Sequence, residues 1–240
     1  MVKIITFCLM IVSLVVLNTV ECLGISQALN VVFKTLTSMF FVMTGFFAAK
    51  DAQPKTEKLK LTKYKKLVLM GLIFGMLGDI LLVIKFISQG FFIAGVVAFA
   101  IGHIFYVIAF TSKEPKLSIV NFIPMIIIMP AFFLLVFISK KFDFEGLFPC
   151  IVFYGLLLTF MLGKSFSLVQ FKNKAKSFVT LTLTGVTLFA ISDIILLFIL
   201  FMEMQPLLNN ILGVFNLATY YVGQGLIALS LTKETLAVRD

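Results

Sequence analysis

Residues 71–86, GLIFGMLGDILLVIKF, decide how this chain folds. The stretch is apolar except for Asp79 and, near its end, Lys85. An α-helix needs about 20 apolar residues to cross a bilayer core, and this run has nearly that length together with the apolar residues before it. A charged side chain at the centre of such a helix costs about 2.5–3.5 kcal/mol on insertion scales. A carboxylate kept at this position therefore predicts a functional site within the membrane.

The composition is that of a membrane protein. Of the 240 residues, 61% are hydrophobic and 13% are charged, and the mean hydropathy is +1.13. A soluble domain has roughly half its residues apolar and about a quarter charged. The net charge of +9 comes from lysines placed between apolar runs. That pattern is typical of membrane topology, so we expect no nucleic-acid partner. The three cysteines, Cys8, Cys22 and Cys150, have no metal-binding spacing and predict no disulfide framework.

Eight apolar runs have the length of a membrane-spanning helix. They cover residues 4–22, 29–49, 67–84, 90–110, 118–138, 147–168, 178–202 and 208–231. The connections between them are short, except for the lysine-rich segment 50–66. The sequence therefore predicts an all-α polytopic membrane protein with one transmembrane domain over residues 1–240.

The basic residues predict the orientation. With eight spans, sixteen of the 20 basic residues fall on the side that carries both termini. The opposite side has Lys85, Lys140 and Lys141, and Lys34 falls within a span. By the positive-inside rule both termini are cytosolic.

A different interpretation of residues 1–24 stays open. They could form a cleaved signal peptide, with Lys3 in its charged region, which would leave seven spans in the manner of a receptor. The loop charges do not distinguish the two cases. The long apolar run and the poor cleavage site at Glu21–Cys22 favour a retained helix.

The motif around Asp79 recurs near Asp193, within GVTLFAISDIILLFIL at residues 185–200. A glycine precedes each aspartate by eight residues, and a tyrosine follows each by 27. The pairs, all 114 residues apart, are Gly71 and Gly185, Asp79 and Asp193, and Tyr106 and Tyr220. Two parallel four-helix repeats, in halves 4–110 and 118–231, would explain this offset. The alternative is a chance recurrence in a chain rich in Leu and Ile.

Under the repeat interpretation, Asp79 and Asp193 lie at equivalent depths. We then expect the two carboxyls to face each other near the central axis and to share one proton. A carboxylic acid beside a carboxylate suits general acid–base chemistry.

Further polar residues fall within the spans, and each alone is compatible with a hydrogen-bonded packing role. His103 and Tyr106 are three residues apart, and Tyr220 and Gln224 are four apart, so each pair shares a helix face. Lys34 could extend toward the membrane surface or bind a lipid phosphate. The candidate site residues are Asp79, Asp193, His103, Tyr106, Tyr220, Gln224, Ser192 and Lys34.

The motifs that hold these residues resemble those of the lysoplasmalogenases of the YhhN-like membrane family, from Lys34 to about Leu229. One departure is Thr35, which follows Lys34 where the family often has proline. The shared motifs are Gly78–Asp79 followed by Ile-Leu-Leu, Phe99-x3-His103-x2-Tyr106, Gly185-x3-Phe189-x2-Ser192-Asp193, Tyr220–Tyr221 followed by Gln224, and Tyr154 with Met161.

The resemblance implies an eight-span hydrolase that acts on lysoplasmalogens, which are lysophospholipids with a vinyl ether bond. The products would be a fatty aldehyde and glycerophosphoethanolamine or glycerophosphocholine. For an animal member it implies the endoplasmic reticulum membrane, and we expect no cofactor and no metal.

The residues suit this chemistry. Vinyl ether hydrolysis begins with a proton delivered to an alkene carbon, and water then captures the resulting oxocarbenium ion. Glycosidases stabilise a similar cation with two carboxyl groups. The hypothesis is that Asp79 and Asp193 divide the acid and base roles, while His103, Tyr106, Tyr220 and Gln224 orient water or relay protons.

Three other functions remain open. A metal-assisted hydrolase could use Asp79, Asp193 and His103 as ligands, although no two of them have a compact spacing. A proton-coupled transporter could use the same intramembrane acids. A receptor would require removal of residues 1–24, but the chain lacks Trp, an Asp-Arg-Tyr end to the third span and an Asn-Pro motif in the last one.

Overall fold

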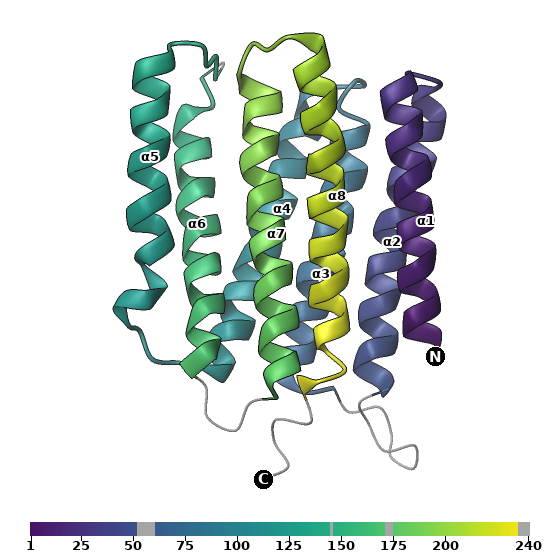
Figure 1. Cartoon of the computed structure of the whole chain (residues 1–240), viewed down its shortest axis with the longest axis vertical. Helices are drawn as coiled ribbons and strands as arrows, with labels where there is room; N and C mark the ends of the chain where they lie inside the picture. The colour runs from purple at the N-terminus through teal and green to yellow at the C-terminus, as the bar shows by residue number, and fades with distance from the viewer. Residues whose placement is uncertain (52–60, 145, 171–174, 235–240) are drawn as a thin grey trace.

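The structure is a computed structural model that describes residues 1–51, 61–144, 146–170 and 175–234. Over these residues the chain forms eight α-helices and two 3-10 turns (Figure 1). In chain order they are α1 (Val2–Leu23), α2 (Gln27–Asp51), α3 (Lys63–Val83), α4 (Gln89–Lys113), η1 (Ile119–Asn121), α5 (Ile123–Ser139), α6 (Phe148–Ser167), η2 (Leu168–Gln170), α7 (Lys176–Phe201) and α8 (Pro206–Ser230).

All eight predicted spans are present. Each helix, with η1 counted together with α5, is long and apolar enough to cross a membrane. The predicted fold class is therefore confirmed. Most of the lysine-rich connection predicted at 50–66 lies outside the described residues. Whether the first helix is retained or cleaved stays a prediction.

The tightest packing joins consecutive helices, α3 with α4 and α7 with α8. Small residues permit these close approaches. A Cβ atom on Gly71 would lie 2.5 Å from the ring of Tyr106, and one on Gly185 would lie 2.7 Å from the carbonyl oxygen of Gly223. Glycine at these positions therefore sets how closely the helices that carry the two aspartates approach their neighbours.

The two halves of the chain repeat one packing pattern. In the first half α2 packs against α3 and also against α8. Its counterpart in the second half, α6, packs against α7 and also against α4. In each half, the second helix therefore packs against the last helix of the other half. The duplication of a four-helix unit itself stays a prediction.

The first helix of each half departs from this pattern. α1 packs against α2 and α8 and buries a face that includes Met10, Leu14 and Leu17. α5 packs mainly against α6 and η1, and it buries only Pro124 and Met129 of its described residues. In Figure 1 α5 is the outermost helix on the left of the bundle.

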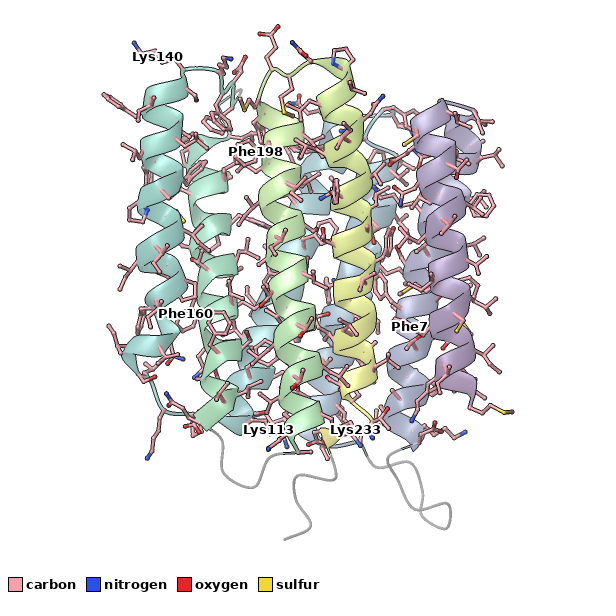
Figure 2. All side chains as sticks on the ribbon, viewed as in Figure 1. Phe7, Lys113, Lys140, Phe160, Phe198 and Lys233 are labelled. Carbon is pink, nitrogen blue, oxygen red and sulfur yellow. The ribbon has the colours of Figure 1, made fainter. Side chains whose placement is uncertain are left out.

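The N-terminus and the C-terminal end of α8 both lie at the lower end of the bundle in Figure 1, as an even number of spans requires. Figure 2 shows Lys113 and Lys233 at this end and Lys140 at the upper end. The chain after α8 is fixed here by the buried Glu234, whose carboxylate pairs with Lys113 of α4 and lies 3.7 Å from Lys65 of α3. The ion pairs hold three helices together on the side where the basic residues are concentrated.

Candidate active site

The polar residues of the bundle form two clusters, one around each aspartate. The Asp193 cluster consists of Asp193 on α7, His103 on α4 and Tyr154 on α6. The Asp79 cluster consists of Asp79 on α3, Ser38 on α2, and Tyr220 and Tyr221 on α8. Each cluster includes one pair of helices that packs across the two halves of the chain, α4 with α6 and α2 with α8.

In the Asp193 cluster two side chains approach the same carboxylate oxygen. The Tyr154 hydroxyl donates a hydrogen bond to Oδ2 of Asp193 over 2.8 Å. Nε2 of His103 lies 3.4 Å from that oxygen, and the imidazole is fully buried. Tyr154 and Phe189 pack against the imidazole, each with its ring centroid 5.0 Å away. The carboxylate is thus held by one hydroxyl, with an imidazole beside it.

The imidazole of His103 forms no hydrogen bond with a described residue, and its contact with Asp193 is not aligned for one. A buried polar group left without a partner costs about 1–3 kcal/mol. Such groups are rare in native proteins, and each calls for an explanation. The imidazole beside Asp193 is therefore a candidate for a functional role.

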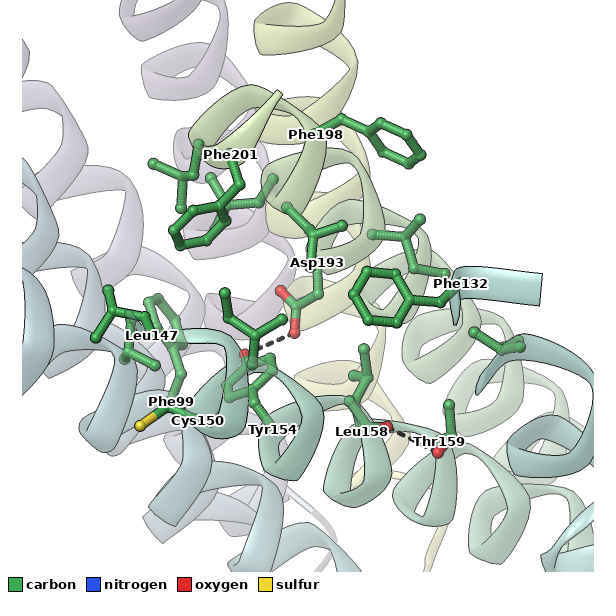
Figure 3. Close-up of a pocket in the computed structure, with 18 of the residues that line it drawn as sticks. Phe99, Phe132, Leu147, Cys150, Tyr154, Leu158, Thr159, Asp193, Phe198 and Phe201 are labelled. Carbon is green, nitrogen blue, oxygen red and sulfur yellow. Dashed lines mark hydrogen bonds between the residues drawn. The ribbon is translucent and has the colours of Figure 1, made fainter. Parts of the chain in front are cut away.

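Asp193 lines a cavity of about 400 Å³ between α4, α5, α6 and α7. Most of the wall is apolar, with Phe99 on α4, Phe132 on α5 and Phe198 on α7 among its side chains. Figure 3 shows Asp193 among these side chains, with its hydrogen bond to Tyr154 dashed. Among the described lining residues Asp193 is the one charged group. The volume lies in the range of small-molecule pockets, about 300–1,000 Å³, and the apolar wall suits a hydrocarbon chain.

The Asp79 cluster is enclosed. The Ser38 hydroxyl donates to Oδ2 of Asp79 over 2.6 Å and lies 3.2 Å from the hydroxyl of Tyr221. Tyr220 also interacts with this carboxylate, and so does the charge of Lys34. The aspartate is 3% exposed and does not line the cavity. Its contacts join α2, α3 and α8.

Tyr106 and Gln224, which the sequence suggests as site residues, contact each other. The Tyr106 hydroxyl donates to Oε1 of Gln224 over 2.7 Å, which links α4 to α8. Both side chains are fully buried. The described hydrogen bonds connect neither of them to Asp193, so this pair is separate from that cluster.

Ser192 and Lys34 also lie apart from the Asp193 cluster. Ser192 is buried, and its carbonyl accepts a hydrogen bond of 2.7 Å from the side chain of Asn216. Lys34 is half-buried on α2, where its charge lies near Asp79. It lines neither the apolar cavity beside Asp193 nor a second recess at the upper end of the bundle.

An aromatic layer connects the two clusters. The ring of Tyr220 lies 5.5 Å from that of Phe189, which in turn lies 5.0 Å from the imidazole of His103. Tyr220 also packs at 5.9 Å against Phe99, a residue of the cavity wall. The Asp79 cluster therefore lies one aromatic layer behind the cavity.

The expected shared proton is not borne out. The described residues include no hydrogen bond between the two aspartates, because Asp79 is bonded to Ser38 and Asp193 to Tyr154. Because the two aspartates lie in separate clusters, the structure also does not bring together Asp79, Asp193 and His103, the metal ligands considered from the sequence. Among the described residues no group of three or more His, Cys, Asp and Glu side chains could hold a metal ion.

Sequence reasoning gave no role to two residues that contact the aspartates. Tyr154 belongs to a recognised motif of the sixth span, but nothing in the sequence connects it to Asp193, which lies 39 residues away. Ser38 is a small polar residue in an apolar run, and such residues are common in packed membrane helices. Ser38 and Tyr154 do share one signal: each is a polar residue on the span that directly precedes the span of its aspartate.

These features define an integral membrane protein with a buried carboxylate–imidazole pair at an apolar cavity. The sequence model of the YhhN family matches residues 29–231, and the chain therefore belongs to the YhhN family. The match confirms the family resemblance seen in the motifs, and membership is consistent with a hydrolase. Comparisons with curated proteins and with solved structures gave no significant match.

Proposed function

We propose that this protein hydrolyses the vinyl ether bond of lysoplasmalogens, releasing a fatty aldehyde and glycerophosphoethanolamine or glycerophosphocholine. The observation that carries the proposal is the apolar cavity with Asp193 in its wall and the unpaired His103 beside that carboxylate. Family membership supports the same class of reaction. The substrate is a membrane lipid, and a cavity between membrane helices would receive it directly from the bilayer.

The reaction consumes one water molecule and needs a proton donor. A proton adds to the alkene carbon farther from the ether oxygen, and the adjacent carbon becomes part of an oxocarbenium ion. Water adds to that carbon and loses a proton, which gives a hemiacetal. The proton lost by the water replaces the one taken at the start. The bond from the hemiacetal carbon to the glycerol oxygen then breaks, the hemiacetal hydroxyl loses its proton to become the aldehyde, and one proton goes to the glycerol oxygen.

Asp193 is the catalytic residue of the proposal because it lines the cavity. Its carboxyl donates the first proton, and the carboxylate so formed stabilises the cation and accepts a proton from the attacking water. The hydrogen bond from Tyr154 fixes the orientation of the carboxyl. His103, 3.4 Å from the same oxygen, exchanges protons with it between turnovers.

In this proposal Asp79 has a different role from that of the sequence hypothesis. It lies behind the aromatic layer and so does not touch the substrate. We propose that it positions Tyr220, whose ring supports Phe189 and, through it, the imidazole of His103. Tyr106 and Gln224 would fix α4 against α8 in the same layer.

The cellular location is part of the proposal. We expect the endoplasmic reticulum membrane, with both termini in the cytosol. The support is the family resemblance for the organelle and the excess of lysine on the terminal side for the orientation.

The test is aldehyde release from a lysoplasmalogen by the purified, detergent-solubilised protein. We expect release by the wild type, none above background by Asp193→Asn, and normal release by Glu203→Gln. Glu203 is an exposed acid at the upper end of the bundle, so its amide variant is a matched control. Near-normal release by Asp193→Asn would contradict the mechanism.

A folded wild type that releases no aldehyde would contradict the proposed function. The two buried carboxylates, Asp79 and Asp193, would then favour the proton-coupled transporter. Proton flux into liposomes that contain the protein would test that second function.

A further inference from the structure

A second recess lies at the upper end of the bundle, beside the apolar cavity. Its volume is about 510 Å³, and its polar lining consists of Lys85, in the connection after α3, and Gln89, at the start of α4. Four residues, Phe92, Leu147, Leu200 and Phe201, line both this recess and the apolar cavity. The two spaces therefore adjoin, one with a polar wall and one with an apolar wall.

The recess carries an unneutralised positive charge. Lys85 forms no ion pair with any described residue, and no other charged side chain lines the recess among those residues. Partial burial lowers the pKa of Lys85, and the nearby charge of Lys34 lowers it further, while that of Glu21 opposes the shift. A bound anion would relieve this repulsion, so the recess is suited to a negatively charged group.

The depth of Asp193 fits a lysophospholipid with its head group in the recess. Along α7, Phe201 is eight residues beyond Asp193, which corresponds to about 12 Å at 1.5 Å per residue. In a lysoplasmalogen roughly five bonds, or about 6 Å, separate the ether oxygen from the phosphorus. The long side chain of Lys85 can cover part of the remaining distance.

We propose that Lys85 and Gln89 bind the phosphate of a lysophospholipid whose vinyl ether lies at Asp193. The inference rests on the proposed function for the identity of the lipid. The hydrocarbon chain then lies in the apolar cavity toward Ile127, Ile128 and Leu158. This placement gives the phosphate role to Lys85 in place of Lys34, which lines neither space.

The kinetic test compares a substrate with the phosphate to one without it. The substrates are 1-alkenyl-glycerophosphoethanolamine and 1-alkenylglycerol, and the variants are Lys85→Gln and Lys85→Arg. For the phospholipid we expect Lys85→Gln to raise KM about tenfold with kcat unchanged, which corresponds to about 1.4 kcal/mol. We expect Lys85→Arg to keep KM near the wild-type value, and neither variant to change KM for 1-alkenylglycerol.

Lys140→Gln is the matched control, because Lys140 is an exposed lysine at the same end of the bundle but outside the recess. We expect it to behave as the wild type. An unchanged KM in Lys85→Gln, or an equal rise for both substrates, would overturn the head-group site. An equal loss in Lys140→Gln would show a general surface-charge effect and overturn it as well.

A binding experiment separates this inference from the proposed function. Radiolabelled 1-O-alkyl-glycerophosphoethanolamine has no vinyl ether, and its binding can be measured at equilibrium on the wild type and on Lys85→Gln. Lys85-dependent binding without aldehyde release from any substrate would support the site and contradict the hydrolase. Aldehyde release with binding that is independent of Lys85 would support the hydrolase and overturn the site. Lys85-dependent binding of inorganic phosphate alone, without the lipid, would assign the site to free phosphate and overturn the lipid assignment.

Discussion

The regions around Asp79 and Asp193 are built alike but differ in access. In each, a carboxylate on the third helix of its half accepts a hydrogen bond from a hydroxyl on the second helix, Ser38 on α2 or Tyr154 on α6. A side chain from the last helix of the other half completes each cluster, Tyr220 for Asp79 and His103 for Asp193. Asp79 is nevertheless enclosed, whereas Asp193 lines a cavity.

The difference follows from the first helix of each half. α1 lies close against α8, where a Cβ atom on Gly225 would be 2.6 Å from the ring of Phe7 and 2.7 Å from the end of Met10. α5 packs mainly on α6, for example through Met129 at Gly155, and both of these residues line the cavity. The two first helices thus pack differently, and the half in which the first helix packs less closely is the half whose aspartate lines a cavity.

The largest effect expected from this comparison is the difference between the two Asp→Asn variants. A positioned general acid contributes about 10²–10⁴-fold to rate. We expect Asp193→Asn to lower kcat by at least about 10³-fold and Asp79→Asn by about tenfold, measured as aldehyde release at saturating substrate. Equal losses would restore the sequence hypothesis of two catalytic carboxyls and contradict the distinction between the clusters.

The second effect concerns access to the cavity. All three cysteines are exposed, but Cys150 lines the cavity, while Cys8 and Cys22 lie on α1. We expect a hexyl methanethiosulfonate to attach at Cys150, fill part of the cavity and lower aldehyde release about tenfold, within the size of typical pocket effects of 1–3 kcal/mol. Reduction of the mixed disulfide should restore the rate.

The control for this effect is Cys150→Ala, which should resist the reagent. A Cys8→Ala and Cys22→Ala double variant should remain sensitive. Inhibition that persists in Cys150→Ala would show that the cavity is not the site of the effect.

The third prediction compares the hydroxyls of Ser38 and Tyr154, which donate hydrogen bonds to Asp79 and Asp193. Hydrogen bonds to charged groups contribute about 1.5–3 kcal/mol to stability. Because Ser38 is fully buried, we expect Ser38→Ala to lower the free energy of unfolding by about that amount with little change in KM. Tyr154→Phe removes the hydrogen bond from a carboxylate that lines a cavity and is less tightly enclosed than Asp79, so we expect a smaller loss of stability and a clear loss of kcat. Thermal unfolding and kinetics on both variants measure this, and a reversed pattern would contradict it.

The eight helices could be predicted from the sequence, and both aspartates could be singled out as candidates, because each leaves a local signal. A span is visible in its apolar run, and a carboxylate inside such a run is conspicuous in a chain that is 61% hydrophobic. The partners of the aspartates could not be predicted in the same way. Ser38 reaches Asp79 across 41 positions, and His103 reaches Asp193 across 90, through helix packing that no local pattern encodes.

The expectation of a shared proton failed for a related reason. The 114-residue offset relates Asp79 to Asp193 along the chain, but it does not say whether the two helices place these side chains against each other. Phe189, whose ring lies between Tyr220 and the imidazole of His103, belongs to a motif of its span, but nothing in that motif places the ring between the two clusters. The cavity could not be predicted from the sequence either, because an apolar run shows that α5 can span a membrane but not how closely it packs on its neighbours.

The smallest effect tests the close packing of α1 itself. A methyl group added at Gly225 must displace Phe7 and Met10, and overpacking of this kind costs about 1–3 kcal/mol. Gly213 is the matched control on the same helix, since a Cβ atom there would have no atom within 4 Å. Gly213→Ala should be neutral or raise stability by up to about 1 kcal/mol through helix propensity. Thermal unfolding should therefore rank Gly225→Ala below the wild type and Gly213→Ala level with it or above. Equal stability of the two variants would mean that α1 yields to the methyl group, and that its packing does not distinguish the closed half from the open one.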